Sequence, residues 1–322
     1  MSTTNNTEKK RYLAAEVGMD VNGKPHAFHV EGYISRPAYV TRGTEDKKSY
    51  LGTAIGTTTE TEALMALADG SYEKGKEYGG GEFLSLNMFG SLAESFSKVC
   101  EVGLKVAVSG TFEWHDYTSK DGAPRKELRL LVDNLVVMGS RTKEGEISNR
   151  VGHATRMFAD IDGVVHNQPY TELMTGEVIG AKGLKSSASG HEYLSFGVKT
   201  KIPAKKIYDL ATGTYKDGNE YDTKKCIVNA VLFDRTAKAL ANLIRNGAQV
   251  VCSGAVTARE YNGETSYQMV PRVISIMKFA PKVEDENAAN TGAAPTGSVA
   301  SAGYSGTSDF VPMDDEDDEL PF

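Results

Sequence analysis

One arrangement of residues occurs twice in this chain of 322 residues. In each copy a phenylalanine is followed by a glycine 14 residues later, a second glycine 7 beyond it and a tyrosine 7 further on, before a turn glycine. The matched residues are Phe89, Gly103, Gly110, Tyr117 and Gly122 in the first copy, and Phe233, Gly247, Gly254, Tyr261 and Gly263 in the second. Residues 31–34 and 162–165 also match as first strands, with a proline shortly after each. Agreement at this many spacings indicates a duplicated domain.

The order of elements in the first copy narrows the fold class. Alternating or continuous apolar residues predict five strands, and helical spacing predicts two helices. The predicted strands are 27–37, 50–57, 82–89, 104–117 and 126–138, and the helices are 60–69 and 90–100. Five strands with a helix between the third and the fourth is the order of the OB-fold, a small barrel that commonly binds oligonucleotides. We therefore expect an all-β protein with short helices, built from tandem five-stranded OB-fold barrels.

The second copy follows the same order from about residue 156 to 278. Its helix is predicted at 235–245, and a polar insertion at 208–224 separates its second and third strands. The domain organisation that we expect is a disordered N-terminus at 1–24, barrels at 25–139 and 154–280, a linker at 140–153, a low-complexity tether at 281–308 and an acidic tip at 309–322.

The charge is divided unequally along the chain, whose net charge is -7. Residues 283–322 hold ten acidic residues and no lysine or arginine. The rest of the chain contains 33 acidic and 36 basic residues and therefore has a net charge of about +3. A slightly basic body with a separate acidic tail can bind phosphates more readily than a body that carries the whole negative charge.

The last nine residues are six adjacent carboxylates followed by Leu320-Pro321-Phe322. Adjacent like charges repel and leave little to bury, so a solvated tail is one interpretation. The apolar end favours another. Pro321 stiffens the backbone, Phe322 offers a ring to a pocket, and the terminal carboxylate offers a charge to a cation, as in terminal-carboxylate capture. We expect a partner-docking tip formed by Asp317, Asp318, Glu319, Leu320, Pro321 and Phe322.

Several protein classes are not indicated. No apolar run is long enough to span a membrane, and the N-terminal residues lack the apolar core of a secretory signal. The three cysteines show no pairing pattern, which favours a reducing cytoplasm. The histidines are scattered without metal-ligand spacing, and no phosphate loop or nucleophile–base motif is found. We therefore expect no cofactor, no metal site and no enzyme activity.

Two segments resemble a known family. Asn87-Met-Phe-Gly-Ser-Leu-Ala-Glu94, with Val102-Gly-Leu-Lys-Val-Ala-Val-Ser-Gly110, resembles the core of bacterial single-stranded DNA-binding proteins. Residues 231–235 and 246–254 resemble it more loosely, and the acidic tip resembles the end of their tails. Together with the tail, the resemblance covers most of the chain. The common form of the family has one barrel per chain and assembles as a tetramer, whereas the two barrels of this chain resemble the two-barrel variant.

The resemblance implies sequence-independent binding and protection of single-stranded DNA during replication, recombination and repair, with genome-maintenance partners recruited by the tip. It further implies a cytoplasmic, nucleoid-associated homodimer that presents four barrels.

The base-stacking aromatics of that family can be placed on this sequence. They fall on Phe83, Phe89 and Tyr117 in the first copy and on Phe233 and Tyr261 in the second, where Ile227 replaces the equivalent of Phe83. Trp114, the single tryptophan, is a further candidate. A phenylalanine in a strand is most often a core residue, so core packing stays open for each. Candidate phosphate contacts are Lys105, Arg129 and Arg259, taken from a wider set with Arg36, Arg125, Lys126, Lys199, Lys201 and Arg272.

A second function class also stays open. The chain could be an OB-fold interaction scaffold in which one or both barrels do not bind DNA and the tip is the main working part. Salt-sensitive binding to a single strand separates the two classes.

Overall fold

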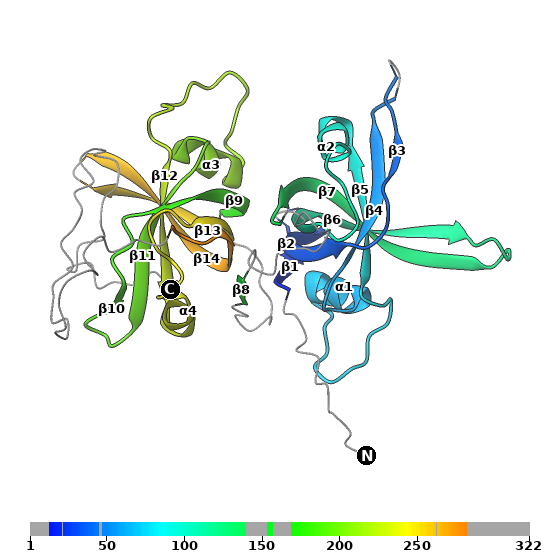
Figure 1. The fold of residues 1–322 in the computed structure, drawn as a ribbon, viewed down its shortest axis with the longest axis horizontal. Coiled ribbons are helices and arrows are strands. Elements are labelled where there is room, and N and C mark those ends of the chain that lie inside the picture. The colour runs from blue at the N-terminus through cyan, green and yellow to red at the C-terminus, as the bar shows by residue number, and fades with distance from the viewer. Residues whose placement is uncertain are drawn as a thin grey trace, which may run out of the picture.

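A computed structural model describes residues 13–20, 22–44, 47–139, 153–156, 169–261 and 263–281. Most of the predicted linker, the tether from residue 282 and the predicted docking tip lie outside these ranges. The described part is mostly β-structure in two sheets, each closed into a barrel (Figure 1). The all-β fold with tandem barrels is therefore confirmed. No helix in these ranges is long and apolar enough to cross a membrane.

The first barrel contains seven strands and two helices among the described residues. Its strands are β1 (Ala15–Met19), β2 (Pro25–Ile34), β3 (Tyr39–Thr41), β4 (Tyr50–Gly56), β5 (Phe83–Phe89), β6 (Lys105–Thr118) and β7 (Pro124–Val137), and its helices are α1 (Thr61–Asp69) and α2 (Gly90–Phe96). The sheet runs β1-β2-β6-β7-β5-β4-β3, and pairing of β2 with β4 closes it. Only β5 and β7 pair in parallel. The N-terminus was predicted to be disordered to residue 24, but β1 pairs with β2 along its whole length.

The second barrel repeats this topology in six of its seven described strands. Its strands are β8 (His153–Arg156), β9 (Tyr170–Ile179), β10 (Leu184–Ser186), β11 (Glu192–Lys199), β12 (Ile227–Phe233), β13 (Gln249–Tyr261) and β14 (Glu264–Lys278), and its helices are α3 (Ala204–Ala211) and α4 (Asp234–Leu240). The sheet order is β10-β11-β12-β14-β13-β9, closed by pairing of β11 with β9. β9 is therefore the equivalent of β2, whereas β8, which precedes it in the chain, pairs with β14. The matching of residues 162–165 to residues 31–34 was therefore wrong. Gly176 of β9 corresponds to Gly32 of β2, and residues 162–165 lie outside the described part.

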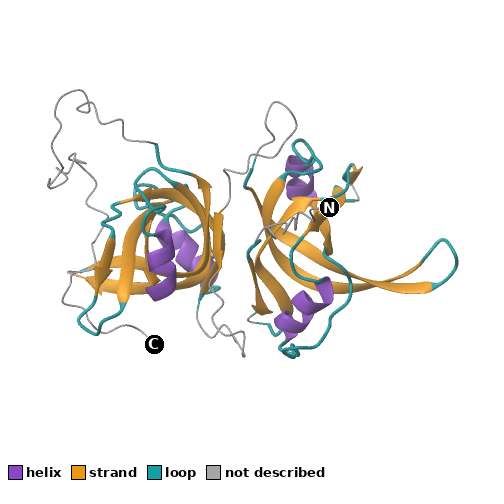
Figure 2. Cartoon of the chain, turned by 60° about the horizontal axis from the view of Figure 1, so that its bottom comes forward, coloured by secondary structure: helices purple, strands orange, loops and turns teal. Residues whose placement is uncertain are grey.

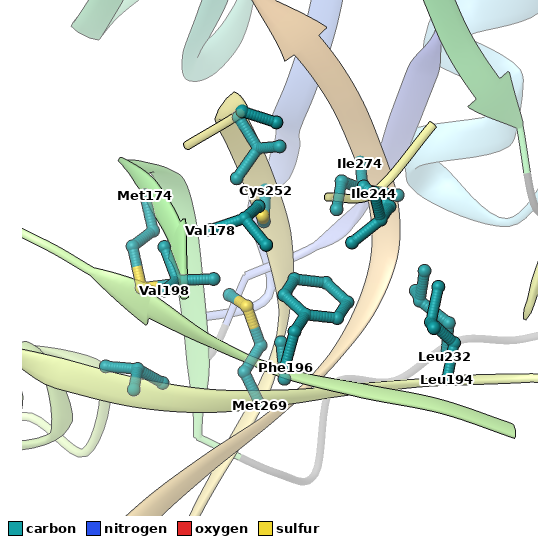
Figure 3. Packing of buried hydrophobic residues seen from close by; sticks show 14 of the residues in the cluster. Met174, Val178, Leu194, Phe196, Val198, Leu232, Ile244, Cys252, Met269 and Ile274 are labelled. Carbon is teal, nitrogen blue, oxygen red and sulfur yellow. The ribbon is translucent and has the colours of Figure 1, made fainter. Parts of the chain in front are cut away.

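Each core is filled from alternate positions of the strands. On β5, Leu84, Leu86 and Met88 have no exposed surface, because successive side chains of a strand point to opposite faces. Figure 3 shows the equivalent packing in the second barrel, where Phe196, Leu232 and neighbouring residues meet in its centre. Burial of these apolar side chains is the dominant favourable term in folding.

Two of the repeated glycines stand where neighbouring strands approach closely. A Cβ on Gly110 would lie 2.0 Å from the carbonyl oxygen of Leu131, and one on Gly254 would lie 2.3 Å from that of Val270. Each glycine sits beside a break in the register of its long hairpin. The duplicated spacing therefore preserves two positions at which only glycine fits.

Gly110→Ala is expected to destabilise the protein by about 1–3 kcal/mol, because the methyl group displaces a strand backbone. The neighbouring Ser109→Ala is the matched control. Its buried hydroxyl has no hydrogen-bond partner among the described residues, so its removal is expected to be neutral or stabilising. Urea unfolding measures both, and equal stability of Gly110→Ala and the wild type would contradict the close approach.

A buried polar network joins the two barrels, which lie side by side in Figure 2. Glu31 is fully buried and pairs with Lys105 of its own barrel, at 3.0 Å between Oε2 and Nζ. His29 lies between Glu31 and Ser253 of the second barrel, with its Nδ1 3.1 Å from the Ser253 hydroxyl. Ser275, also of the second barrel, donates to Glu31. These contacts tie the barrels together at a site closed to water.

Apolar side chains and a second ion pair surround this network. Ala107 and Met138 of the first barrel pack with Leu173 and Val251 of the second, all buried. At one edge, Arg272 is 3.0 Å from Glu16, a residue of β1 that also accepts a hydrogen bond from the Tyr170 hydroxyl. The barrels are thus in direct contact through residues from β1, β2, β6, β9, β13 and β14.

The charge on Glu31 makes this contact sensitive to acid. Burial by itself raises the pKa of Glu31, but hydrogen bonds from His29 and Ser275 and the charge of Lys105 outweigh it and lower the pKa to about 2. A carboxyl whose pKa is lower in the folded than in the unfolded state stabilises the fold when ionised. Its contribution is complete above the ordinary value of 4.5 and is lost as the pH falls toward 2.

Glu31→Gln is expected to cost about 3–5 kcal/mol near neutral pH, because it removes the carboxylate charge that is paired with the buried Lys105. Between pH 4.5 and 2 the variant should lose less further stability than the wild type. Urea midpoints at several pH values test this, with the exposed Glu113→Gln as the control. If the two proteins lose the same stability between pH 4.5 and 2, ionisation of Glu31 is not the cause of the acid sensitivity.

Candidate nucleic-acid interface

Two phenylalanines stand on the outer face of β5. Because Leu84, Leu86 and Met88 point into the core, Phe83 and Phe89 must point outward, and they are 66% and 51% exposed. At about 3.3 Å per residue the two rings leave the strand about 20 Å apart. The sequence analysis left core packing open for both, and their exposure rules it out.

A ladder of three rings crosses the sheet at the Phe89 end. Phe89 is the direct partner of Tyr50 on β4, with their ring centroids 5.3 Å apart. Tyr50 lies 6.3 Å from Tyr39 on β3, which is 69% exposed. We call Tyr39, Tyr50 and Phe89 the aromatic ladder. Three large rings gathered on one surface are typical of a binding site rather than of a solvated face.

Sequence reasoning missed two of the three ladder residues. Tyr39 is on a three-residue strand with no period to reveal it, and Tyr50 was recognised only as the start of a strand. A signal existed in the repeat, because Tyr50-Leu51 and Tyr193-Leu194 begin equivalent strands. Tyr193 is the direct partner of Phe233, as Tyr50 is of Phe89.

Basic side chains lie beside the ladder on the connection between β3 and β4. Arg42 follows β3, and Lys47 and Lys48 precede β4; all three are exposed. They were not among the predicted phosphate contacts. Their positions put three cations on the loop that joins the strands of Tyr39 and Tyr50.

The centre of the outer face is polar and internally paired. Arg36 donates to the Ser85 hydroxyl at 3.1 Å, Ser85 donates to Glu127, and Arg129 is 3.1 Å from Glu127. Burial raises the pKa of Glu127, but these hydrogen bonds and the two arginine charges outweigh it and hold the pKa below its usual value. Arg129, a predicted phosphate contact, therefore lies on the correct face but is paired with a carboxylate.

The extensions of β6 and β7 beyond the barrel form a long hairpin arm that projects from it (Figure 1). Phe112 is buried in the core, so Trp114 continues the inner face of the arm while His115 and Tyr117 continue the outer face. Tyr117 stacks on His115 with their rings 7° from parallel, and Lys126 lies 4.8 Å over the Trp114 ring. Tyr117 thus shares a face with Phe83 and Phe89, whereas Trp114 is on the opposite side of the arm.

The equivalent face of the second barrel presents fewer exposed aromatic rings. Phe233 is half-buried, and Ile227 stands at the other end of β12 in place of Phe83. The backbone of Tyr261 ends β13, and its side chain lies outside what the structure describes. Arg259, a predicted phosphate contact, is half-exposed on the same hairpin. The rings that are exposed in the first barrel are thus partly covered or replaced here.

Lys105 requires a correction. It was predicted to contact phosphates, but it is 1% exposed and ion-paired with Glu31 between the barrels. A side chain enclosed there cannot reach a polymer. The predicted docking residues, Asp317 to Phe322, lie outside the described part of the chain.

No protein-family model matches this chain, and no curated protein sequence matches it. Three solved structures similar to it are of single-stranded DNA-binding proteins. The small single-stranded DNA-binding protein from Streptomyces coelicolor is 14% identical, over 34% of this chain and 90% of its own, with a TM-score of 0.25. The wild-type protein from Thermus aquaticus is 10% identical, over 89% of this chain and 98% of its own, with a TM-score of 0.23.

The SSB domain of a Synechococcus protein is 8% identical, over 33% of this chain and 89% of its own, with a TM-score of 0.21. TM-scores this low carry no argument about fold or function. The functional conclusion therefore rests on this chain's own residues.

Proposed function

We propose that this protein binds single-stranded DNA without sequence preference and protects it. The aromatic ladder carries the proposal, because it presents two exposed rings and a half-buried one at the edge of a barrel, and the adjoining loop carries exposed basic residues. Stacking on an aromatic ring contributes about 1–3 kcal/mol per base and accepts every base. Neutralisation of phosphates by neighbouring cations makes such binding fall with salt.

The strand path in this proposal follows the outer face of the first barrel. Bases stack at the ladder, at Phe83 and at Tyr117 on the arm, while Arg42, Lys47 and Lys48 meet phosphates. The ionised Glu127 at the centre opposes phosphate approach, so the strand crosses there through its bases. The second barrel contributes less, since Ile227 replaces a stacking ring and Phe233 is half-buried.

The C-terminal tip and the assembly are part of the same proposal. Residues 309–322 recruit genome-maintenance proteins to the bound strand during replication, recombination and repair. The chain acts without catalysis of its own, at the nucleoid in the cytoplasm, as a homodimer that presents four barrels. The basis for these points is the acidic run with its apolar end, together with the family resemblance of the sequence.

Phe89→Ala is expected to weaken binding of poly-dT by about 1–3 kcal/mol, because it removes one ring of the ladder. Titration at about 0.05 and about 0.2 M salt measures this through quenching of tryptophan and tyrosine fluorescence. Leu210→Ala is the control, since Leu210 is 52% exposed on α3 of the second barrel and lies off the proposed path. Phe233→Ala should have a smaller effect than Phe89→Ala.

Absence of salt-sensitive binding by the wild-type chain would contradict the proposal. The interaction-scaffold function, with the tip as its working part, would then be favoured.

Deletion of residues 309–322 is expected to tighten poly-dT binding at about 0.05 M salt and to have little effect at about 0.2 M. The acidic segment competes with phosphates for the same cations, and salt screens this competition. The same titration, made with the shortened chain, measures it. Unchanged affinity at low salt would show that the tail does not compete.

A further inference from the structure

The segment between β4 and β5 and the segment between β11 and β12 contain a second sequence repeat. Residues 67–78 and 210–221 share the pattern Leu-Ala-x-Gly-x-Tyr-x-x-Gly-x-Glu-Tyr, with serine or threonine before the first tyrosine. The first segment contains the end of α1 and the loop that follows it, and the second contains the end of α3 and the loop that follows it.

The two tyrosines of each loop are stacked on one another. Tyr72 and Tyr78 lie 5.3 Å apart with their rings 12° from parallel, and Tyr215 and Tyr221 lie 6.4 Å apart at 14°. The glycine between them has a φ of +90° in both loops, a conformation that side chains rarely adopt. The stack is therefore a built feature of the insertion, held by the same turn in both barrels.

The two stacks differ in what covers them: in the first barrel Lys76 lies 5.5 Å over the Tyr78 ring, and Tyr72 is exposed. In the second, the Asp209 carboxylate accepts a hydrogen bond from Tyr221, and Lys206 lies 5.1 Å over the Tyr215 ring. The residue equivalent to Lys206 in the repeat is Ala63, whose small side chain lies in the floor of a groove of about 610 Å³ beside Tyr72 and Tyr78. Tyr72 itself is 42% exposed.

This groove continues the proposed strand path. A shallower groove of about 400 Å³ begins at Phe83 and is lined by Thr57 and Thr58. The tyrosine groove is lined by the next residues along the chain, Thr59 and Glu60. A single strand that leaves β5 at Phe83 therefore enters the tyrosine groove without crossing the barrel.

We propose that the Tyr72–Tyr78 stack is an additional nucleobase site, which takes a base from the single strand that runs past Phe83. It rests on the proposed function, because it extends that path. A base adds a third ring to the stack on the side that Ala63 leaves open. Glu60, Glu77 and Lys76 line the groove, and its two negative charges exceed the one positive charge, so stacking rather than phosphate attraction holds the base. The same carboxylates disfavour the acidic C-terminal tip as the occupant.

The test compares short and long strands. With an oligothymidylate of about 16 nucleotides, Tyr72→Ala/Tyr78→Ala should bind about 5-fold or more weakly than the wild type. With about 4 nucleotides, which the ladder alone can hold, the two proteins should bind equally. The salt dependence should not change, because tyrosines release no counterions. The matched control is Tyr215→Ala/Tyr221→Ala, which should leave both affinities within about 2-fold of the wild type.

Photo-cross-linking of the wild-type chain keeps the test independent of how the variant folds. A long strand that carries 5-iodouracil should cross-link to Tyr72 or Tyr78, as located by mass spectrometry, and a short strand should not. Cross-links at Phe89 or Tyr50 with none at the tyrosine stack would overturn this inference while supporting the proposed function. If the wild-type chain binds neither the short nor the long strand, both this inference and the proposed function are wrong.

One further outcome identifies a different occupant. If the double variant binds every strand normally but no longer binds a labelled peptide of residues 314–322, the groove is a peptide site and the nucleobase proposal is wrong.

Discussion

Alternation of side chains along β5 is the constraint on which the candidate interface depends. The strand must give Leu84, Leu86 and Met88 to the core, so the positions at its two ends face outward. The closed barrel fixes the register of β4 against β5, and this register puts Tyr50 directly opposite Phe89. An exposed aromatic surface thus follows from the same pairing that buries the core.

The contact between the barrels determines which surfaces of each barrel a ligand can reach. Glu31, Lys105 and His29 are enclosed where β2 and β6 meet the second barrel, so this side is closed to a ligand. A buried ion pair offers less stability than its Coulomb attraction suggests, because both charges lose their hydration. The contact of His29 with Ser253 and the hydrogen bond from Ser275 to Glu31 instead specify one arrangement of the two barrels.

The two copies agree more closely at positions where the backbone requires glycine than at exposed positions on the surface. Gly110 and Gly254 are both retained because no side chain fits beside the facing strand. Phe83 has no aromatic counterpart, and the tyrosine stacks differ in what covers them. A side chain added at a position enclosed by backbone displaces that backbone and destabilises the fold, whereas an exposed ring can be exchanged with little effect on folding. The two barrels can therefore share a fold and divide the binding work unequally.

The sequence by itself determined the duplicated all-β architecture, the position of the strand-end aromatics and the two close-approach glycines. These features are local periods and spacings, which a chain displays without being folded. The tertiary structure alone decided that Tyr39 and Tyr50 join Phe89, that Trp114 and Tyr117 face opposite sides of the arm, and that Lys105 is buried. Each of these depends on strand register or on contact between barrels, and such long-range pairings leave no mark in the spacing of residues along one strand.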